Sequence, residues 1–242
     1  LKANGKVDVK ELSDLLGVTG VTIRNDLEQL EKKNILIRAR GGAIKIEQSY
    51  SHEDFPLSDK QKKNFVEKRE IGKKAAELIS NNNTIILDSG STVHQLAKNL
   101  RNFEELTVIT NALNVATLLA EFKNINVIVP GGTLKKNSLS LFGILAEKGF
   151  RDYFCDKLFL GVDGFDLDFG ISTPSPEEAY LNQIMIDISK EVIVLADSSK
   201  FERRGFAFIA PVSKINIVIT DKGIRPEYKS RLEATGIKVI VV

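Results

Sequence analysis

Residues 84–97 read TIILDSGSTVHQLA, and this stretch decides the fold. Four β-favouring residues run into Asp88, and apolar residues at helical spacing begin almost at once after Gly90. A buried strand followed directly by a helix is the repeating unit of a parallel α/β sheet. The turn between them leaves backbone N–H groups at the end of the strand, where an anionic ligand can bind.

The turn lacks the signatures of the common nucleotide and nucleophile motifs. It has neither the spaced Gly-Lys-Ser/Thr of a P-loop, nor the three glycines of a dinucleotide fold, nor the G-x-S-x-G of a hydrolase elbow. Its hydroxyls still suit a phosphate group, so we expect a ligand at Asp88, Ser89, Gly90, Ser91 and Thr92. The alternative is that Ser91 only caps the helix. His94, one turn further, is expected to be an ordinary helix-face residue.

Strand-like and helix-like segments alternate along the rest of the chain. The strand-like segments are 84–87, 106–109, 125–129, 158–162, 192–195, 215–219 and 237–242. Amphipathic helical spacing covers 65–79, 92–101, 112–121, 141–150, 176–189 and 226–235. Near-continuous Val, Ile and Leu strands separated by helices predict an α/β fold with a doubly wound, mostly parallel sheet that is covered on both faces.

Polar residues or glycines follow six of these strands. The carboxyl ends of parallel strands form one edge, where open sheets bind their ligands, so we expect a polar pocket there. Besides the turn at 88–92, the residues expected around the ligand are Asn111, Gly131, Gly132, Asp163, Glu178 and Lys200. Lys200 can pair with a ligand phosphate or with Asp197, and the sequence leaves both open.

Glu178 has two interpretations. The sequence SPEE at 175–178 fits a capping box, with Ser175 at the N-cap of a helix, Pro176 in its first turn and Glu178 reaching back. The carboxylates can also contact an amine or a hydroxyl of a ligand.

The first 47 residues have a different pattern, which is helix, tight turn, helix and hairpin. Residues 9–16 have helical spacing, and Gly17 ends that helix. Its apolar face is Val9, Leu12, Leu15 and Leu16. Thr19 is placed to cap a second helix, and two alternating segments joined through Gly41 and Gly42 predict a hairpin.

This order predicts a winged helix-turn-helix, whose second helix enters the major groove of DNA. The expected DNA contacts are Thr19, Gly20, Thr22, Arg24, Asn25, Arg38, Arg40 and Lys45. The alternative is a small protein-interaction module with solvated arginines. A trihelical core normally begins with a helix before residue 1, so we expect this first helix to be truncated.

The chain therefore divides into a DNA-binding domain at 1–47, a linker at 48–64 and an effector-binding domain at 65–242. Residues 1–74 carry 16 Lys/Arg against 12 Asp/Glu, a mild bias toward a polyanionic partner. No apolar run approaches the roughly 20 residues of a membrane span. With a single cysteine, Cys155, and two histidines, no metal cluster is expected, and we expect a cytoplasmic protein.

Six motifs together resemble the DeoR-type family of bacterial sugar-metabolism repressors. They are VTIRNDLEQLE (21–31), RARGGA (38–43), LDSGST (87–92), LFLGVDGFD (158–166), GIST (170–173) and ADSSKF (196–201). The chain departs from the usual pattern at Asn25, where most members have a second Arg, and at Arg40, where most have His. The Asn form, with VDGFD and DSSKF, is most similar to repressors of the N-acetylgalactosamine/galactosamine pathway.

The resemblance implies a transcriptional repressor that binds double-stranded operator DNA, with no cofactor and with a phosphorylated sugar or aminosugar as effector. It implies a sensor domain related to ribose-5-phosphate isomerase and glucosamine-6-phosphate deaminase. Because helix-turn-helix proteins commonly read palindromes as dimers, we expect a homodimer or homotetramer. A third reading is a constitutive DNA-binding protein with a vestigial pocket.

The rival reading is an enzyme, a sugar-phosphate isomerase or aminosugar-phosphate deaminase with an accessory module. In those isomerases a Glu follows the Asp that matches Asp163, and here Gly164 stands in its place. Proton shuttling needs a positioned partner of tuned pKa, so we expect binding without turnover and no catalytic residue.

Overall fold

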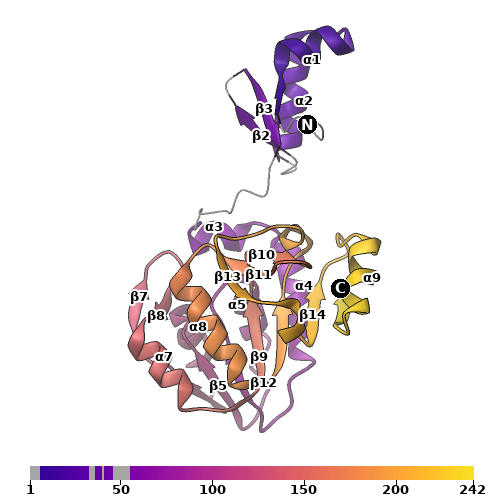
Figure 1. Ribbon diagram of the computed structural model, residues 1–242. Coiled ribbons are helices and arrows are strands. Elements are labelled where there is room, and N and C mark those ends of the chain that lie inside the picture. The colour runs from indigo at the N-terminus through magenta and orange to yellow at the C-terminus, as the bar shows by residue number, and fades with distance from the viewer. Residues whose placement is uncertain (1–5, 33–35, 40, 46–54) are drawn as a thin grey trace. The chain divides into compact units, whose positions relative to one another are not determined.

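The computed structural model describes residues 6–32, 36–39, 41–45 and 55–242. The chain forms two compact units, Leu1–Ser49 and Tyr50–Val242 (Figure 1). Each unit has its own hydrophobic core. Arg40 and His52 lie outside the described residues.

The N-terminal unit is a helix-turn-helix with a small antiparallel sheet of strand order β1-β3-β2. Its elements are β1 (Lys6–Asp8), α1 (Val9–Leu16), α2 (Gly20–Lys32), β2 (Leu36–Ala39) and β3 (Gly42–Lys45). The Asp8 carboxylate caps α1 by accepting the N–H of Lys10 at 2.7 Å. Gly17 ends α1 with a left-handed φ of 66°. Both predicted helices and the hairpin are confirmed, and β1 is an addition to them.

The core of this unit is small. It consists of Val9, Ile23, Leu27 and Ala43, with Leu12 among the side chains packed against it. Of the apolar face expected on α1, Val9 is buried and Leu12 is partly buried, because α1 meets this core through its first turns. Leu15 and Leu16 in its last turn are 78% and 60% exposed.

The C-terminal unit is built on seven parallel strands in the order β15-β14-β12-β9-β4-β5-β6. These strands are β4 (Thr84–Leu87), β5 (Leu106–Thr110), β6 (Ile125–Ile128), β9 (Cys155–Gly161), β12 (Ser189–Leu195), β14 (Ile217–Thr220) and β15 (Lys238–Val241). The α-helices are α3 (Leu57–Lys62), α4 (Phe65–Ala76), α5 (Ser91–Ala97), α6 (Leu113–Leu119), α7 (Ile144–Arg151), α8 (Pro176–Asp187) and α9 (Pro226–Ala234). Two 3-10 turns are η1 (Ser198–Lys200) and η2 (Val212–Lys214). The predicted parallel α/β sheet is confirmed, with strand ends shifted by a few residues.

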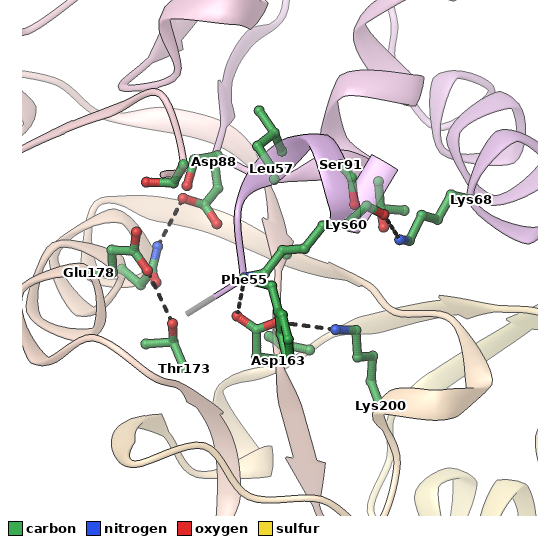
Figure 2. A pocket seen from close by; sticks show the side chains of 17 residues that line it. Phe55, Leu57, Lys60, Lys68, Asp88, Ser91, Asp163, Thr173, Glu178 and Lys200 are labelled. Atoms are coloured by element: carbon green, nitrogen blue, oxygen red, sulfur yellow. Dashed lines mark hydrogen bonds and ion pairs between the residues drawn. The ribbon is translucent and has the colours of Figure 1, made fainter. Parts of the chain in front are cut away.

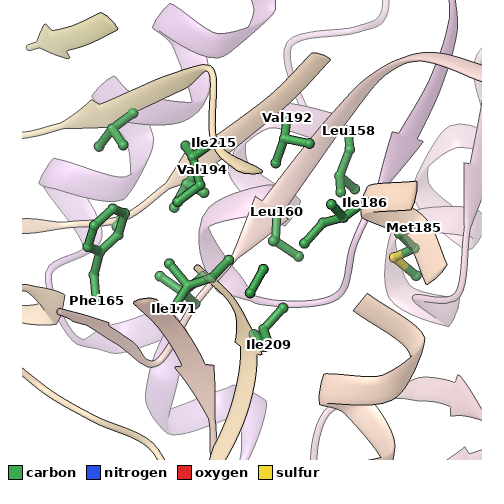
Figure 3. Close-up of a cluster of buried hydrophobic side chains, with 14 of the residues drawn as sticks. Leu158, Leu160, Phe165, Ile171, Met185, Ile186, Val192, Val194, Ile209 and Ile215 are labelled. Atoms are coloured by element: carbon green, nitrogen blue, oxygen red, sulfur yellow. The ribbon is translucent and has the colours of Figure 1, made fainter. Parts of the chain in front are cut away.

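Helices cover both faces of the sheet. Side chains of α4, α5 and α6 belong to one core, and side chains of α7, α8 and α9 belong to the other. Successive residues of one strand alternate between the two cores. Leu158 and Leu160 pack in the core that contains α8 (Figure 3), whereas Phe159 belongs to the core on the opposite face. All three are fully buried. Burial on both faces explains why the strands read as unbroken apolar runs.

The direction in which strands are added reverses between β4 and β9. From β4 the chain proceeds outward through β5 and β6, and from β9 it proceeds the other way through β12, β14 and β15. Strands β4 and β9 are parallel neighbours, with Ile86 opposite Leu158. The loops that leave the carboxyl ends of two such strands turn to opposite faces and open a crevice between them.

Three features lie outside the predicted alternation. A second sheet is antiparallel and consists of β10 (Gly164–Asp166), β11 (Gly170–Thr173) and β13 (Ala207–Ala210). A hairpin is formed by β7 (Thr133–Lys135) and β8 (Ser140–Phe142). The third is α3, which lies within the stretch interpreted as a linker. Leu57 is the one buried residue of this six-residue helix, so it has no helical period to detect.

Within the described residues, no helix has both the length and the apolar character needed to cross a membrane.

Candidate functional site

A pocket opens at the carboxyl ends of β4 and β9, where the direction of strand addition reverses (Figure 2). Eight of the eleven residues expected around the ligand line it: Asp88, Ser89, Gly90, Ser91, Thr92, Asp163, Glu178 and Lys200. The other lining residues are Phe55, Leu57, Lys60, Lys68, Ser138, Gly161, Val162, Thr173 and Asn182. The fold thus brings the loops after β4, β9 and β12 to one place.

The turn after β4 has the geometry that its glycine allows. Gly90 adopts a φ of 125°, which residues with a Cβ rarely adopt, and a Cβ there would meet open space. Gly90 itself is the N-cap of α5, so Ser91 is the first helical residue rather than the cap. Ser91 and Thr92 are buried. His94 is not among the residues that line the pocket.

Asp163 lies between two lysines. Its carboxylate oxygens accept hydrogen bonds from Lys60 Nζ and Lys200 Nζ, each at 3.1 Å (Figure 2). Burial alone would raise the pKa of Asp163, but the two ammonium groups outweigh it and hold this pKa at about 2. Lys200 therefore pairs with Asp163 and not with Asp197. Asp197 accepts instead from Asn64 Nδ2 at 2.7 Å.

Lys68 is a third lysine of the pocket, and it is almost fully buried. Its Nζ donates to the backbone carbonyl oxygens of Lys60 at 2.5 Å and Lys63 at 2.7 Å. Burial lowers the pKa of Lys68 to about 8; Asp197 opposes this shift and Lys200 adds to it. At neutral pH the ammonium group therefore remains mostly charged.

Asp88 lines the end of the pocket opposite to Lys60 and Lys200. It is buried, and its carboxylate accepts a hydrogen bond from Asn182 Nδ2 at 3.1 Å. Burial raises the pKa of Asp88 to about 7; the N–H of Ser89 opposes the shift, and the charge of Glu178 adds to it. Near neutral pH this group is therefore divided between its neutral and its ionised form.

Glu178 belongs to the pocket rather than to a capping box. Ser175 caps α8 as predicted, because its Oγ accepts the N–H of Glu178 at 3.4 Å. The Glu178 carboxylate does not reach back, however. It accepts from Thr173 Oγ1 at 3.2 Å and pairs with Lys135 Nζ at 3.2 Å. Glu177 takes the contact with Ser175 Oγ at 2.9 Å, so the prediction of a reciprocal box is wrong.

Asn111, Gly131 and Gly132 do not line the pocket, in contrast to the expectation. They follow β5 and β6, which lie one and two strands from β4 on the side away from β9. Asn111 holds the β7–β8 hairpin, since its Nδ2 donates to the Leu141 carbonyl at 3.3 Å. A Cβ on Gly132 would lie 2.6 Å from the Phe142 carbonyl oxygen, so this glycine lets the hairpin approach. The expectation treated all strand ends alike, whereas the crevice forms only at the reversal.

Several pocket residues escaped the sequence analysis because they come from unpredicted elements. Lys60 comes from α3, Thr173 from β11 and Ser138 from the loop of the β7–β8 hairpin. Thr173 lies in the GIST motif, but the motif alone did not assign it to the ligand. Lys68 left a signal of another kind. It stands at the head of the buried stripe of α4, where Ile71 follows three residues later. A lysine in an apolar stripe is a candidate for a buried functional charge.

In the N-terminal unit, the start of α2 presents polar residues to the surface. Thr22, Arg24 and Asn25 are exposed, while Ile23 between them is buried. Thr19 caps the helix, since its Oγ1 accepts the N–H of Thr22 at 3.2 Å. An exposed polar helix start is what reading of the major groove requires.

The remaining expected DNA contacts are spread over this unit. Gly20 is the first residue of α2, Arg38 lies on β2 and Lys45 on β3. Arg40 lies outside the described residues.

Comparison with known families divides the chain as the two units do. The profile described as "DeoR-like helix-turn-helix domain" matches residues 1–49, and that described as "DeoR C terminal sensor domain" matches residues 63–222. The chain belongs to the DeoR family. Its N-terminal unit is the helix-turn-helix domain and its C-terminal unit the sensor domain of this family of transcriptional regulators.

Relatives match this DeoR-family chain over its full length. One is named "Putative aga operon transcriptional repressor" in Escherichia coli O157:H7, with 39% identity over 100% of this chain and 90% of the relative. Another is named "HTH-type transcriptional repressor GlcR" in Bacillus subtilis, with 35% identity over 100% of this chain and 92% of the relative. Among solved structures, a ribose 5-phosphate isomerase from Methanocaldococcus jannaschii shares 18% identity, with a TM-score of 0.40 over 55% of this chain and 53% of that one.

Proposed function

We propose that this DeoR-family protein represses a sugar-utilisation operon and that a phosphorylated aminosugar, bound in the sensor unit, releases it from DNA. The observation that carries the proposal is the separation of charge along the pocket. Lys60 and Lys200 pair with Asp163 at one end, and the carboxyls Asp88 and Glu178 lie at the other (Figure 2). Glu178 also pairs with Lys135, which does not line the pocket, so Asp88 is the carboxyl of this end that no lysine pairs with among the described ion pairs. A sugar with a phosphate on one carbon and an amine on another has the complementary charges.

The cationic end matches a phosphate group in charge. Among the described residues that line it, Lys60 and Lys200 pair with the ionised carboxylate of Asp163. Lys68 adds a third ammonium group, which donates to backbone carbonyls instead of to Asp163. A phosphate monoester carries about −1.5 to −2 at pH 7. The hydroxyls of the turn at 89–92 provide additional donors for its oxygens.

The acidic end matches an amine. Asp88 and Glu178 are close enough that the charge of Glu178 raises the pKa of Asp88. An ammonium group of a ligand beside Asp88 would stabilise its ionised form and offset the penalty of burial. A neutral hydroxyl would gain less from this carboxyl than an ammonium group would.

Sequence similarity supports the same ligand class. The motifs VDGFD (162–166) and DSSKF (197–201) resemble those of galactosamine-pathway repressors. The relative with 39% identity is named for the aga operon. The first similarity concerns two short motifs and the second the whole chain, whereas the charge separation is a property of the pocket itself.

We propose that the pocket binds its ligand without turnover. Asp163, with a pKa of about 2, is held by two lysines and is a weak proton acceptor at neutral pH. Asp88 has a pKa suited to proton transfer, so the enzyme reading makes Asp88 its acid or base. Incubation of the protein with galactosamine 6-phosphate and with ribose 5-phosphate, followed by NMR, is expected to show no product. Product formation that Asp88→Asn abolishes would establish the enzyme reading instead.

The ligand proposal is tested by calorimetric titration of the full chain with four probes. We expect galactosamine 6-phosphate to bind most tightly. Galactose 6-phosphate, which lacks the amine, and galactosamine, which lacks the phosphate, should each bind at least about 10-fold more weakly, because each leaves one charged end unpaired. Ribose 5-phosphate should also be weaker. Equal affinity for all four probes, or no binding of any phosphorylated sugar, would contradict the proposal.

At the other end of the chain, we propose that α2 reads the operator in the major groove. The proposed contacts in the major groove are Thr19, Gly20, Thr22, Arg24 and Asn25. Arg38, Arg40 and Lys45 are proposed to contact the DNA backbone or the minor groove. Selection of duplexes from a random pool by the full chain is expected to return a palindromic sequence.

We also propose that the protein acts in the cytoplasm as a homodimer or homotetramer, because a palindromic operator calls for two copies of α2. Exposed aromatic side chains at the antiparallel sheet support self-association, since Phe206 and Phe208 are 47% and 53% exposed. Light scattering of the purified chain is the measurement, and a strict monomer at micromolar concentration would contradict the proposal.

A further inference from the structure

Helix α3 forms a wall of the sensor pocket, although it precedes every strand of the sensor sheet. Phe55, Leu57 and Lys60 all line the pocket, and α3 packs against α5, the helix that starts at Ser91. Residues 46–54 connect this region to the DNA-binding unit in the sequence. The pocket is therefore built partly from the first described helix that follows the DNA-binding unit.

Polar contacts hold α3 from three directions. Lys60 Nζ donates to Asp163 at 3.1 Å, beyond the end of β9. The N–H of Leu57 donates to the Asn137 carbonyl at 2.7 Å, in the loop of the β7–β8 hairpin. At the other end of α3, Lys68 Nζ donates to the carbonyl oxygens of Lys60 and Lys63. Two of these three contacts are made by lysines that also line the pocket.

These lysines lie in a region of excess positive charge. The pKa of Lys63 is lowered by burial and by the charges of Arg203 and Lys200, and the pKa of Lys68 is lowered by burial and by Lys200. An anion placed among these groups relieves their mutual repulsion. It also competes for their N–H donors, which in this structure serve Asp163 and the carbonyls of α3.

We infer that Lys60 binds the anionic group of the effector and that effector binding thereby changes the position or the order of α3. This inference rests on the proposed function. A ligand shifts a conformational equilibrium only through contacts that differ between the two states. Lys60 supplies such a contact, because its ammonium group can pair with Asp163 or with the ligand. Lys68 supplies a second one, because its ammonium group can donate either to the carbonyl oxygens at the end of α3 or to the ligand.

In this arrangement the Lys60–Asp163 ion pair takes part in ligand binding and is not purely structural. The Lys60 and Asp163 side chains each retain 23% of their exposed area, so the pair is accessible from the pocket. When Lys60 is lost, the Asp163 carboxylate keeps its hydrogen bond from Lys200 Nζ at 3.1 Å, so no buried charge is left without a partner. Loss of Lys60 should therefore leave the fold intact and act on ligand binding.

The test uses the full chain with three substitutions on α3. Lys60→Gln removes the charge, Lys60→Arg keeps it, and Lys62→Gln is the matched control, because Lys62 lies on the same helix, is exposed and does not line the pocket. Galactosamine 6-phosphate and galactosamine are titrated by calorimetry. Amide hydrogen exchange of peptides covering 57–63 is measured with and without saturating galactosamine 6-phosphate.

We expect Lys60→Gln to weaken galactosamine 6-phosphate binding about 10- to 100-fold, as for loss of a hydrogen bond to a charged group. Lys60→Arg should retain most of the affinity, and Lys62→Gln all of it. Affinity for galactosamine, which lacks the anion, should be unchanged in every variant. In the wild type the ligand should alter exchange within 57–63, and in Lys60→Gln this effect should be reduced at saturation.

The outcomes separate this inference from the proposed function. If the wild type binds the sugar phosphate and Lys60→Gln binds it equally well, the inference is overturned while the proposed function stands. Unaltered exchange of α3 at saturation overturns the conformational part in the same way. If no sugar phosphate binds the wild type, both fall together. Thermal unfolding without ligand identifies a misfolded variant, and a folded Lys60→Arg that rescues binding excludes a purely structural effect.

Discussion

At the scale of single residues, the raised pKa of Asp88 should make the stability of the fold depend on pH. Its pKa is raised from 3.8 to about 7 in the folded protein, chiefly by burial. Between these two values the folded state keeps the proton that the unfolded state has released, so stability falls as pH rises through this window. The free-energy cost of ionising the buried Asp88 carboxyl is fully present above about pH 7 and absent below about pH 4.

Asp88→Asn removes the charge without removing the acceptor oxygen. We expect this variant to unfold at a higher temperature than the wild type at about pH 8, and to show a much smaller gain at about pH 4.5. Asp152→Asn, an exposed aspartate at the end of α7, is the control and should show no such pH dependence. Equal gains at both pH values would show that burial of the charge is not the cause.

Arg24 is the residue on which reading of DNA can be tested most directly. It is exposed on the first turns of α2, where a recognition helix contacts base edges. Arg24→Ala is expected to cost about 1–3 kcal/mol of operator binding, as for loss of a bidentate contact to guanine. Fluorescence anisotropy with a selected duplex is the measurement. Gln29→Ala, five residues further along α2, is the control, and an unchanged affinity of Arg24→Ala would contradict the assignment.

At the scale of elements, the wing depends on one close approach of two strands. A Cβ added to Gly42 would lie 2.0 Å from the Val7 carbonyl oxygen, so a side chain there cannot coexist with the pairing of β1 and β3. Gly42→Ala should loosen the N-terminal unit and leave the sensor unit intact. Hydrogen exchange would then increase in peptides within 6–45 and remain unchanged within 65–242.

Gly20→Ala is the matched control for that substitution. A Cβ at Gly20 makes only ordinary contacts, the nearest at 3.5 Å from Val9 Cγ1, and alanine favours a helix over glycine by about 1 kcal/mol. The N-terminal unit should therefore exchange more slowly in this variant. An equal loosening by both substitutions would contradict the argument from strand pairing.

How well an element could be predicted from the sequence depended on how deeply it is buried. Strands such as β4 and β9 are covered on both faces and read as unbroken apolar runs, so their positions were evident. The capped helices α1 and α8 were evident from Gly17 and from Ser175 with Pro176. The short strands β7, β10 and β11 were not evident, because they contain no unbroken apolar run and too few residues to show an alternation.

At the scale of the whole molecule, the proposed function requires effector binding and operator binding to be linked. A coupling free energy of about 1–3 kcal/mol, typical of such proteins, would lower operator affinity 5- to 150-fold when the effector is bound. By the same linkage, operator DNA must lower effector affinity by the same factor. Anisotropy of a labelled operator with and without galactosamine 6-phosphate measures one factor, and calorimetry with and without the operator measures the other. Unchanged operator affinity at saturating sugar phosphate would contradict the coupling.

The sequence by itself determined the parts of the site that follow strands directly. Strand ends could be predicted from the apolar runs before them. The pocket residues that follow such ends are the turn at 88–92, Asp163 and Lys200. It also determined the polar start of α2, because the cap at Thr19 and the buried stripe fix which side of the helix is exposed.

Only the tertiary structure decided which strand ends share a pocket and what else reaches it. Asn111 and Gly132 carried the same kind of signal as Asp163, yet the strand order places them beside a hairpin instead of at the crevice. Lys60 carried no signal, yet a long-range contact brings it to Asp163. The physical reason is that local sequence fixes each element through its own hydrophobic period and caps. The order of strands is fixed by how all the elements bury their faces together, and no single segment contains that information.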